Sequence, residues 1–458
     1  MANDSSTDGL RVPTQSYGRQ NHLRRRISRE TLDLISSLPD VILHDILSFM
    51  PTKFAIRTSL LSKRWRRVWC ETPSLSFDKC SPESPSLNEI LTRYTAPKMV
   101  NFHLHTIVMN NIPHHINRWI KLVMSRNVEN ISLDLWNHVG YKFPDFFYIN
   151  SSVKQIRLKL SPRDMMVPRG SVSWTSLRKL YLDSSSLSDE SMAKILSGCP
   201  SLERLKLCFC NALKILDLNK SMRLRTLEIN SDPQFPRTLQ IVAPYIHCLI
   251  LKSSHHLPCV LVDVSSLVEA RLNISIASVS KTKNDSLQVM VLNMLEKLQN
   301  VEKLTFVGGN LLKILSMAEL RGVPFPMFKF KSLTLERVIF RYVIPGIERV
   351  LKNSPNLKKL HTKDCYHKQR VYLGDYVDLQ AFNLDQCWRS KYGEVWYNSC
   401  LDVEPEHVVS FMDLTLKNTK ALIRQDGLLL EDHYLRFKEL VPTLPHNCNV
   451  SVALYTKP

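Results

Sequence analysis

Apolar residues recur in one fixed pattern through the middle of the chain. Each copy has an apolar residue, two residues of any kind, a second apolar residue, one residue of any kind and a third apolar residue. Successive first positions are 25, 24, 25, 22, 22, 21, 34, 29 and 27 residues apart. The ten copies, the last with threonine in its third slot, are Val128/Ile131/Leu133, Val153/Ile156/Leu158, Leu177/Leu180/Leu182, Leu202/Leu205/Leu207, Leu224/Leu227/Ile229, Ile246/Leu249/Leu251, Leu267/Ala270/Leu272, Val301/Leu304/Phe306, Phe330/Leu333/Leu335 and Leu357/Leu360/Thr362. The pattern predicts a short strand in each copy, with alternate side chains facing a core.

One such strand cannot bury its apolar face alone, so neighbouring copies must stack into a curved solenoid with a shared core. Most of the spacings lie within the 20–29 residues that are typical of leucine-rich repeats. Between two strands, Ser188 is placed to cap a helix with Met192, Ile195 and Leu196 on its inward face. The segment IPGIERVLKNSPN repeats this plan. We predict an α/β solenoid, a leucine-rich-repeat horseshoe, over residues 126–370.

Three short helical segments are predicted between residues 34 and 72. Ser37, Thr52 and Ser62 are each placed to cap one of them. Pro39 stands near the start of the first segment, where its missing N–H costs nothing, and Pro51 ends that segment.

The first of these segments, LPDVILHDILSFMP, carries an unusually wide apolar stripe. On a wheel of about 100° per residue its apolar side chains span roughly 160° of arc. A surface helix needs a stripe of only about 100° or slightly more. The helix therefore has more apolar surface than a small local fold can use. Its members are Ile42, Leu43, Ile46, Leu47, Phe49 and Met50.

The third segment places Trp65 and Trp69 four residues apart, on one helix face, among three arginines. Two interpretations are open. Both indoles could pack inside the small bundle or against the first repeat, or they could remain exposed for a partner, since tryptophan and arginine dominate interface hot spots. Three helices in roughly 40 residues are too few to fold comfortably alone. Together with the wide stripe, this favours a helical partner.

Composition shifts divide the chain into five parts. The predicted parts are a polar tail over 1–33, a three-helix domain over 34–80, a connector with a first repeat over 81–125, the repeats over 126–370, and an α/β cap over 371–458 that ends in the strand NVSVALY.

The segment SSLPDVILHDILSFMPTKFAIRTSLLSKRWRRVW closely resembles the F-box motif, and its combination with the repeats resembles the plant F-box/leucine-rich-repeat proteins. The resemblance covers residues 34 to about 370. It implies a non-catalytic substrate receptor of a cullin-RING ubiquitin ligase, in which the F-box docks on a Skp-family adaptor, and through it on cullin, while the repeats hold a protein substrate. The adaptor-binding positions that it implies are Leu38, Pro39, Ile42, Leu43, Ile46, Leu47, Leu61, Trp65 and Trp69.

The chain has a formal net charge of +19, from 61 basic and 42 acidic residues among 458. A basic chain can bind nucleic acid, but lysine and arginine occur mostly as singles and pairs along the whole chain. The densest run, Arg24-Arg25-Arg26, lies in the polar tail. We therefore expect a solvated basic surface and not a nucleic-acid footprint.

No apolar run opens the chain and none is long enough to span a membrane. We therefore expect a cytoplasmic or nuclear protein whose 11 cysteines are thiols. Cys199, Cys208 and Cys210 lack the paired spacing of a structural zinc site. No phosphate-binding loop or nucleophile motif is present, so we expect no metal, no cofactor and no catalysis.

Two other functions stay open at this stage. The chain could be an interaction scaffold that does not promote degradation, or a basic solenoid that binds nucleic acid. The identity of the substrate, and whether a small ligand or polyanion binds the concave face of the repeats, do not follow from the sequence.

Overall fold

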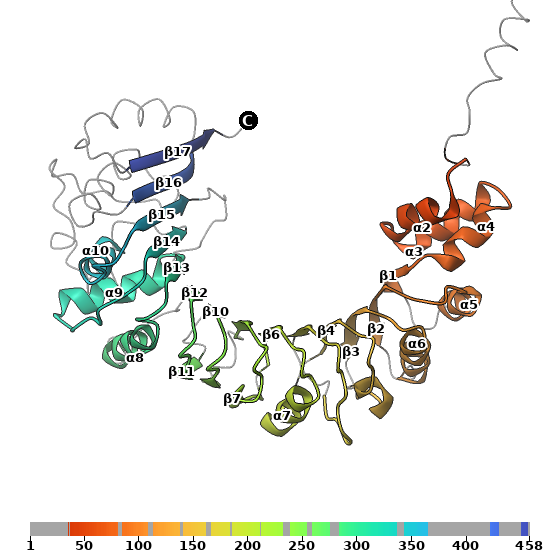
Figure 1. The fold of residues 1–458 in the computed structure, drawn as a ribbon, viewed down its shortest axis with the longest axis horizontal. Helices are drawn as coiled ribbons and strands as arrows, with labels where there is room; N and C mark the ends of the chain where they lie inside the picture. Colours follow the sequence, from red (N-terminus) through yellow and green to blue (C-terminus); the bar gives the residue numbers. More distant parts are fainter. Residues whose placement is uncertain are drawn as a thin grey trace, which may run out of the picture.

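The computed structural model describes residues 35, 37–80, 85–108, 113–137, 141–161, 166–183, 186–210, 212–231, 239–253, 259–274, 284–336, 343–364, 422–429 and 450–456. These residues form a curved arc with a small helical domain at its N-terminal end (Figure 1). The predicted polar tail over 1–33 and most of the predicted cap over 371–458 lie outside the described residues.

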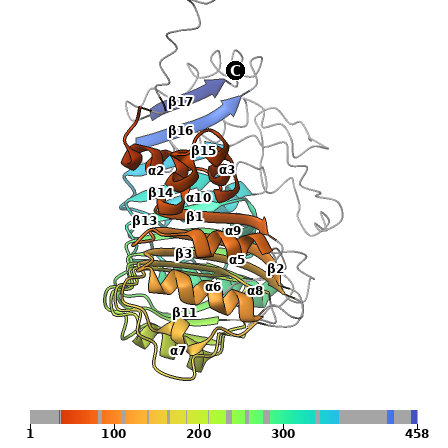
Figure 2. The same cartoon turned by 90° about the vertical axis from the view of Figure 1, so that its right-hand side faces the viewer.

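The arc is built on one parallel sheet of 14 strands, in which ten of the thirteen neighbouring pairs are consecutive along the chain. In Figure 2 the arrows of β1, β16 and β17 point to the same side, as a parallel sheet requires. The strands, in their order in the sheet, are β1 (Ser74–Cys80), β2 (Asn101–Val108), β3 (Asn130–Asn137), β4 (Gln155–Lys159), β5 (Lys179–Asp183), β6 (Arg204–Cys208), β8 (Thr226–Asn230), β10 (Cys248–Ser253), β12 (Glu269–Ile274), β13 (Lys303–Val307), β14 (Ser332–Glu336), β15 (Lys359–Asp364), β16 (Leu422–Leu429) and β17 (Val450–Thr456).

Each of the ten predicted repeats forms one of these strands, from β3 to β15. The register brings equivalent positions together: Ile156 pairs with Leu180, and Leu180 with Leu205. These three side chains are at most 1% exposed and belong to one continuous core. The predicted α/β solenoid is therefore confirmed, and the predicted final strand is present as β17.

A repeated backbone contact joins neighbouring repeats. The carbonyl of the residue just before one strand accepts two N–H groups from the start of the next strand. Glu129 O accepts from Lys154 N at 2.7 Å and from Gln155 N at 3.0 Å. Lys154 O then accepts from Arg178 N and Lys179 N, at 2.8 and 3.1 Å. The contact uses no side chain, so the two donor positions accept any residue except proline, which has no backbone N–H.

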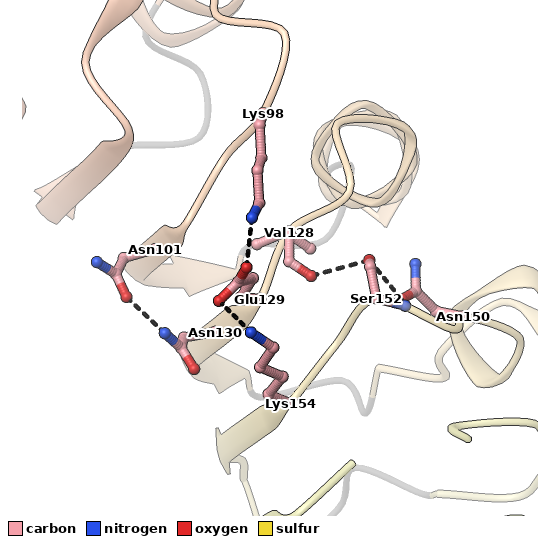
Figure 3. Close-up of polar contacts among 8 residues, drawn as sticks. All are labelled: Lys98, Asn101, Val128, Glu129, Asn130, Asn150, Ser152 and Lys154. Atoms are coloured by element: carbon pink, nitrogen blue, oxygen red, sulfur yellow. Dashed lines mark hydrogen bonds and ion pairs between the residues drawn. The ribbon is translucent and has the colours of Figure 1, made fainter. Parts of the chain in front are cut away.

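The same edge carries side-chain contacts near the N-terminal end of the arc (Figure 3). The Glu129 carboxylate lies between two lysines, 2.6 Å from Lys98 Nζ and 2.9 Å from Lys154 Nζ. Asn130 donates a hydrogen bond from Nδ2 to Asn101 Oδ1 at 2.8 Å. Figure 3 shows both contacts bridging successive strands, so they tie the first repeats together.

The buried faces of the strands are covered on the outer side of the arc. Helices lie there at both ends of the arc (Figure 1), and Ser188 caps α7 as predicted, since its Oγ accepts from Ser191 N at 3.2 Å. The helices are α5 (Pro85–Arg93), α6 (Pro113–Ser125), η3 (Asp145–Tyr148), α7 (Asp189–Ser197), α8 (Asn284–Lys297), α9 (Asn310–Leu320) and α10 (Ile344–Lys352).

In the middle of the arc a second parallel sheet of three strands takes the place of the covering helices. Its strands are β7 (Ile215–Asp217), β9 (Leu239–Val242) and β11 (Cys259–Asp263).

The N-terminal domain contains the predicted helical segments, with different caps. They are α2 (Asp40–Ser48), α3 (Thr52–Arg57) with the 3-10 turn η1 (Thr58–Leu60), and α4 (Trp65–Val68) with η2 (Trp69–Glu71). Pro39 and Pro51 occupy the N-cap positions of α2 and α3, so the prediction that Ser37 and Thr52 cap them is wrong. Arg64 and not Ser62 precedes α4.

The three-helix domain is joined directly to the sheet. Thr52 is 3% exposed, and its Oγ1 accepts a hydrogen bond from Ser76 N in β1 at 2.8 Å. Tyr94 Oη donates to Thr72 O at 2.7 Å, and Cys70 O accepts from Thr95 N at 2.9 Å. The sheet therefore begins within the range that we assigned to the helical domain, at β1, and not at residue 81.

Candidate functional site

The wide apolar stripe of α2 is divided between two faces. Leu43 and Leu47 are 0% and 2% exposed and point into the domain. Ile42, Ile46 and Phe49, which follow one another at intervals of four and three residues, are 45%, 41% and 90% exposed. The domain therefore uses half of the stripe for its own core and leaves the other half in solvent.

Both tryptophans belong to the core. Trp65 and Trp69 are each 4% exposed and pack with Leu43, Leu47 and other buried residues in a small cluster. The expectation that the indoles stay exposed for a partner is therefore wrong, and the alternative, packing inside the bundle, is correct. The physical reason is that large aromatic side chains supply most of the apolar area that so small a domain can bury.

The nine predicted docking residues thus divide into two groups. Leu43, Leu47, Trp65 and Trp69 are interior and present no surface to a partner. The accessible five are Leu38, which is half-buried, and the exposed Pro39, Ile42, Ile46 and Leu61.

More apolar side chains are exposed on this domain than the sequence indicated. We call the eight large ones the exposed F-box set; they are Ile35, Val41, Ile42, Ile46, Phe49, Phe54, Leu60 and Leu61. Their exposed fractions range from 41% to 90%. Single exposed apolar residues are ordinary on a protein surface, but a concentration of them marks an interaction site. The pairing of Leu60 with Leu61, next to polar residues, was a sequence signal for Leu60, which we had not predicted.

One arginine of the third segment has a structural role. Arg64 Nε lies 2.8 Å from Asp40 Oδ1 in the first turn of α2, and Arg64 also donates to the carbonyl of Leu38. These bonds fix the start of α2 against α4. They hold the backbone that carries Pro39 and Ile42, so the exposed stripe has a defined orientation.

Five cysteines of the described residues have pKa shifts that disfavour the thiolate. Burial raises the pKa of the Cys199 and Cys259 thiols to about 12 and that of Cys208 to about 11, and it also raises the pKa of Cys70 and Cys248. A thiol nucleophile needs the opposite shift. Within the described ranges there is also no group of three His, Cys, Asp or Glu side chains that could hold a metal ion.

The concave face of the arc is a second candidate surface. The alternate residues of the large sheet that do not enter the core point to this face, and in β4 to β15 most of them are polar or charged.

The described part of the chain has no helix long and apolar enough to cross a membrane.

Comparison with known proteins matches two segments of the chain to two family models. The F-box domain model matches residues 35–76, and the model described as At1g61320/AtMIF1, LRR domain, matches residues 90–342, more than half of the chain. The F-box/LRR-repeat protein At3g18150 from Arabidopsis thaliana is 64% identical over 463 residues, covering 100% of this chain and 99% of that protein.

Two further relatives extend over nearly the same length. The F-box/LRR-repeat protein At5g02910 from Arabidopsis thaliana is 48% identical over 93% of this chain and 96% of its own length. The F-box/LRR-repeat protein At3g03360 from the same organism is 46% identical over 94% and 92%. The helical domain, the repeat arc and these relatives agree, and the chain belongs to the plant F-box/leucine-rich-repeat proteins.

Proposed function

We propose that this chain is the substrate-holding subunit of a cullin-RING ubiquitin ligase. Its F-box docks on a Skp-family adaptor, which links it to cullin, and its repeats hold a protein substrate. The chain supplies no bond chemistry. It raises the effective concentration of the substrate near the subunits that transfer ubiquitin.

The observation that carries this proposal is the exposed F-box set. The F-box buries both indoles in its core cluster and still leaves eight large apolar side chains in solvent. Burying apolar surface stabilises an interface by about 25 cal/mol per Å² before the costs of association. A helical adaptor that covers the outer stripe of α2 would remove this surface from water.

The test compares adaptor capture by the full chain and by Ile42→Asp/Ile46→Asp. Both side chains are exposed, so we expect the variant to keep its thermal unfolding temperature. Placing two carboxylates in an apolar interface should reduce capture of a Skp-family adaptor at least tenfold, about 1.4 kcal/mol. Leu43 and Leu47 are unsuitable for this test, because a charge in the core would unfold the domain.

Val289→Asp/Met290→Asp is the matched control. These residues are 51% and 41% exposed on α8, outside the F-box. The control should capture the adaptor like the unmodified chain. Equal capture by all three proteins would contradict adaptor docking through α2.

The second candidate function, a scaffold that does not promote degradation, shares the docking step. Substrate turnover separates the two. We expect proteins captured with the unmodified chain under proteasome inhibition to accumulate in cells that carry only Ile42→Asp/Ile46→Asp. If the unmodified chain captures proteins whose lifetimes are the same in both kinds of cell, the chain is a scaffold.

A further inference from the structure

Four cationic side chains gather on the concave face of β4, β5 and β6. In the sheet register, Arg157 pairs with Tyr181, and Tyr181 pairs with Lys206. Two positions earlier on the strands, Lys179 pairs with Arg204. We call Arg157, Lys179, Arg204 and Lys206 the basic patch.

Three members of the basic patch lack acidic partners. Over the described ranges, Arg157, Lys179 and Arg204 make no ion pair with a carboxylate. Lys206 lies 2.9 Å from Glu228, but this carboxylate is shared with Lys252 at 2.7 Å. The patch therefore has a surplus of positive charge.

Two other cations on the same face are neutralised. Arg271 and Glu336 form a two-point ion pair across β13, with Nη1–Oε1 and Nη2–Oε2 distances of 2.8 and 2.5 Å. Lys159 lies 3.5 Å from Asp134 and 5.5 Å from the centre of the Trp136 ring. Arg271 and Lys159 are thus each paired with a carboxylate, whereas Arg157, Lys179 and Arg204 form no such pair over the described ranges.

Like charges that face one another on a sheet are unfavourable. Burial is the main cause that lowers the pKa of His103, two strands from Arg157. Arg157 lowers this pKa only slightly, while Asp78 and Asp134 raise it. A bound anion would relieve the repulsion among the four cations of the basic patch.

The basic patch also offers aromatic surface. Tyr181 is half-buried between Arg157 and Lys206, and Trp136 on β3 is 54% exposed. Tyrosine, tryptophan and arginine are the side chains most often found at the energetic centre of protein interfaces.

We propose that the concave face over β4, β5 and β6 binds an acidic segment of the protein substrate. This inference rests on the proposed function and adds the chemical class of the ligand. A peptide fits better than nucleic acid because Asp134 and Glu228 flank the patch on either side. The basic patch spans only the three strands between them, and a short acidic segment matches that width better than a long phosphate backbone.

The strand spacing sets the pattern of the ligand. Arg157 and Lys206 are two strands apart, which is roughly 10 Å. A peptide in the polyproline II conformation advances about 3.1 Å per residue and returns to the same face every three residues. Two carboxylates three residues apart in the substrate would therefore reach both cations.

The test selects peptides from a random library displayed on phage, using the purified full chain with and without the adaptor. We expect enrichment of peptides with Asp or Glu three residues apart, and binding that weakens as salt is added. In Arg157→Glu/Arg204→Glu, the affinity of a labelled selected peptide should fall about tenfold or more, because attraction becomes repulsion. Lys220→Glu/Arg223→Glu, the same change of charge at exposed positions between β7 and β8, should bind normally.

Three results would overturn the proposal. The selected peptides could lack acidic residues, the Arg157→Glu/Arg204→Glu variant could bind them as well as the unmodified chain, or a labelled single-stranded DNA could bind the patch while acidic peptides do not. Ile42→Asp/Ile46→Asp should lose the adaptor and still bind acidic peptides. Failure of this inference is thus distinguishable from failure of adaptor docking.

Discussion

Neighbouring residues of α2 have opposite roles. Ile42 and Ile46 face solvent, while Leu43 and Leu47, one position later in each case, fill the core. The sequence predicted a stripe too wide for one core, and this was correct. It did not show which side of the stripe is internal, because that depends on where α4 packs. The same dependence explains the error at Trp65, since four-residue spacing places an indole on a face without showing what covers that face.

The contribution of Glu129 to the stability of the fold should depend on pH. Hydrogen bonds from Lys154 and Lys98 hold the pKa of its carboxyl below the ordinary value. A carboxyl with a lowered folded-state pKa stabilises the fold above its unfolded pKa of about 4.3, and this contribution is lost as the pH falls through the folded-state pKa. We expect Glu129→Gln to unfold at lower urea concentration than the unmodified chain at pH 7, with the difference shrinking below about pH 4.

Glu302→Gln is a useful comparison for Glu129→Gln. Glu302 also has a lowered pKa, from its hydrogen bond with Lys331, but it has a single lysine partner at 2.7 Å. Its substitution should have a smaller effect at pH 7. An effect of Glu129→Gln that is constant from pH 7 to the acid limit would show that charge is not the cause.

Among the elements, nine of the ten predicted strands of the large sheet have apolar residues in all three slots of the pattern, and the tenth, β15, has Thr362 in its third slot. β2 fits the pattern too, with Met99, Phe102 and Leu104. β1 has Thr72 in the first slot, where a buried hydroxyl donates to Trp69 O at 2.9 Å. A threonine that satisfies its own polar group can replace an apolar residue, and a pattern of apolar letters does not detect it.

The second sheet could not be predicted from periodicity. Its strands β7, β9 and β11 have only three to five residues, too few to distinguish alternation from chance. They occupy the side of the arc where other repeats place helices. The repeat spacing alone therefore predicts the large sheet. The helices or strands that cover its outer side depend on the residues between the repeated strands.

The contact between α9 and α10 depends on a glycine. Gly346 N donates to the buried Ser316 Oγ at 2.8 Å, and a Cβ added to Gly346 would lie 2.6 Å from Leu312 O. Alanine normally favours a helix over glycine, but here the helices would have to separate. We expect Gly346→Ala to lower the free energy of unfolding by about 1–3 kcal/mol in urea titrations.

Gly170→Ala is the control for the α9–α10 contact. A Cβ at Gly170 meets no heavy atom within 4 Å. This variant should stay within about 0.5 kcal/mol of the unmodified chain. Equal stability of the two alanine variants would mean that α9 and α10 do not approach as closely as described.

On the scale of the whole molecule, the proposed docking surface and the basic patch lie on one continuous framework. The F-box stands at one end of the arc, and β4 to β6 lie farther along it (Figure 1). The half-buried Ile90 of α5 packs against both the F-box core and the repeat core. An adaptor bound at α2 and a substrate held at β4 to β6 would therefore keep a defined separation, which transfer between subunits requires.

In a solenoid each repeat contacts only its neighbours, so damage at one end should fade along the arc. Thr52→Val removes the hydroxyl that accepts from Ser76 N and leaves that amide without its partner. We expect faster amide hydrogen exchange in the F-box helices and β1, a smaller change in β2, and none in β13 and β14. Ser188→Ala, which uncaps α7, should instead accelerate exchange around α7 and leave β1 protected. Faster exchange at β13 and β14 in the Thr52→Val variant would show that the F-box and the arc unfold as one cooperative unit. The separation between the docking surface on α2 and the basic patch would then depend on the whole arc.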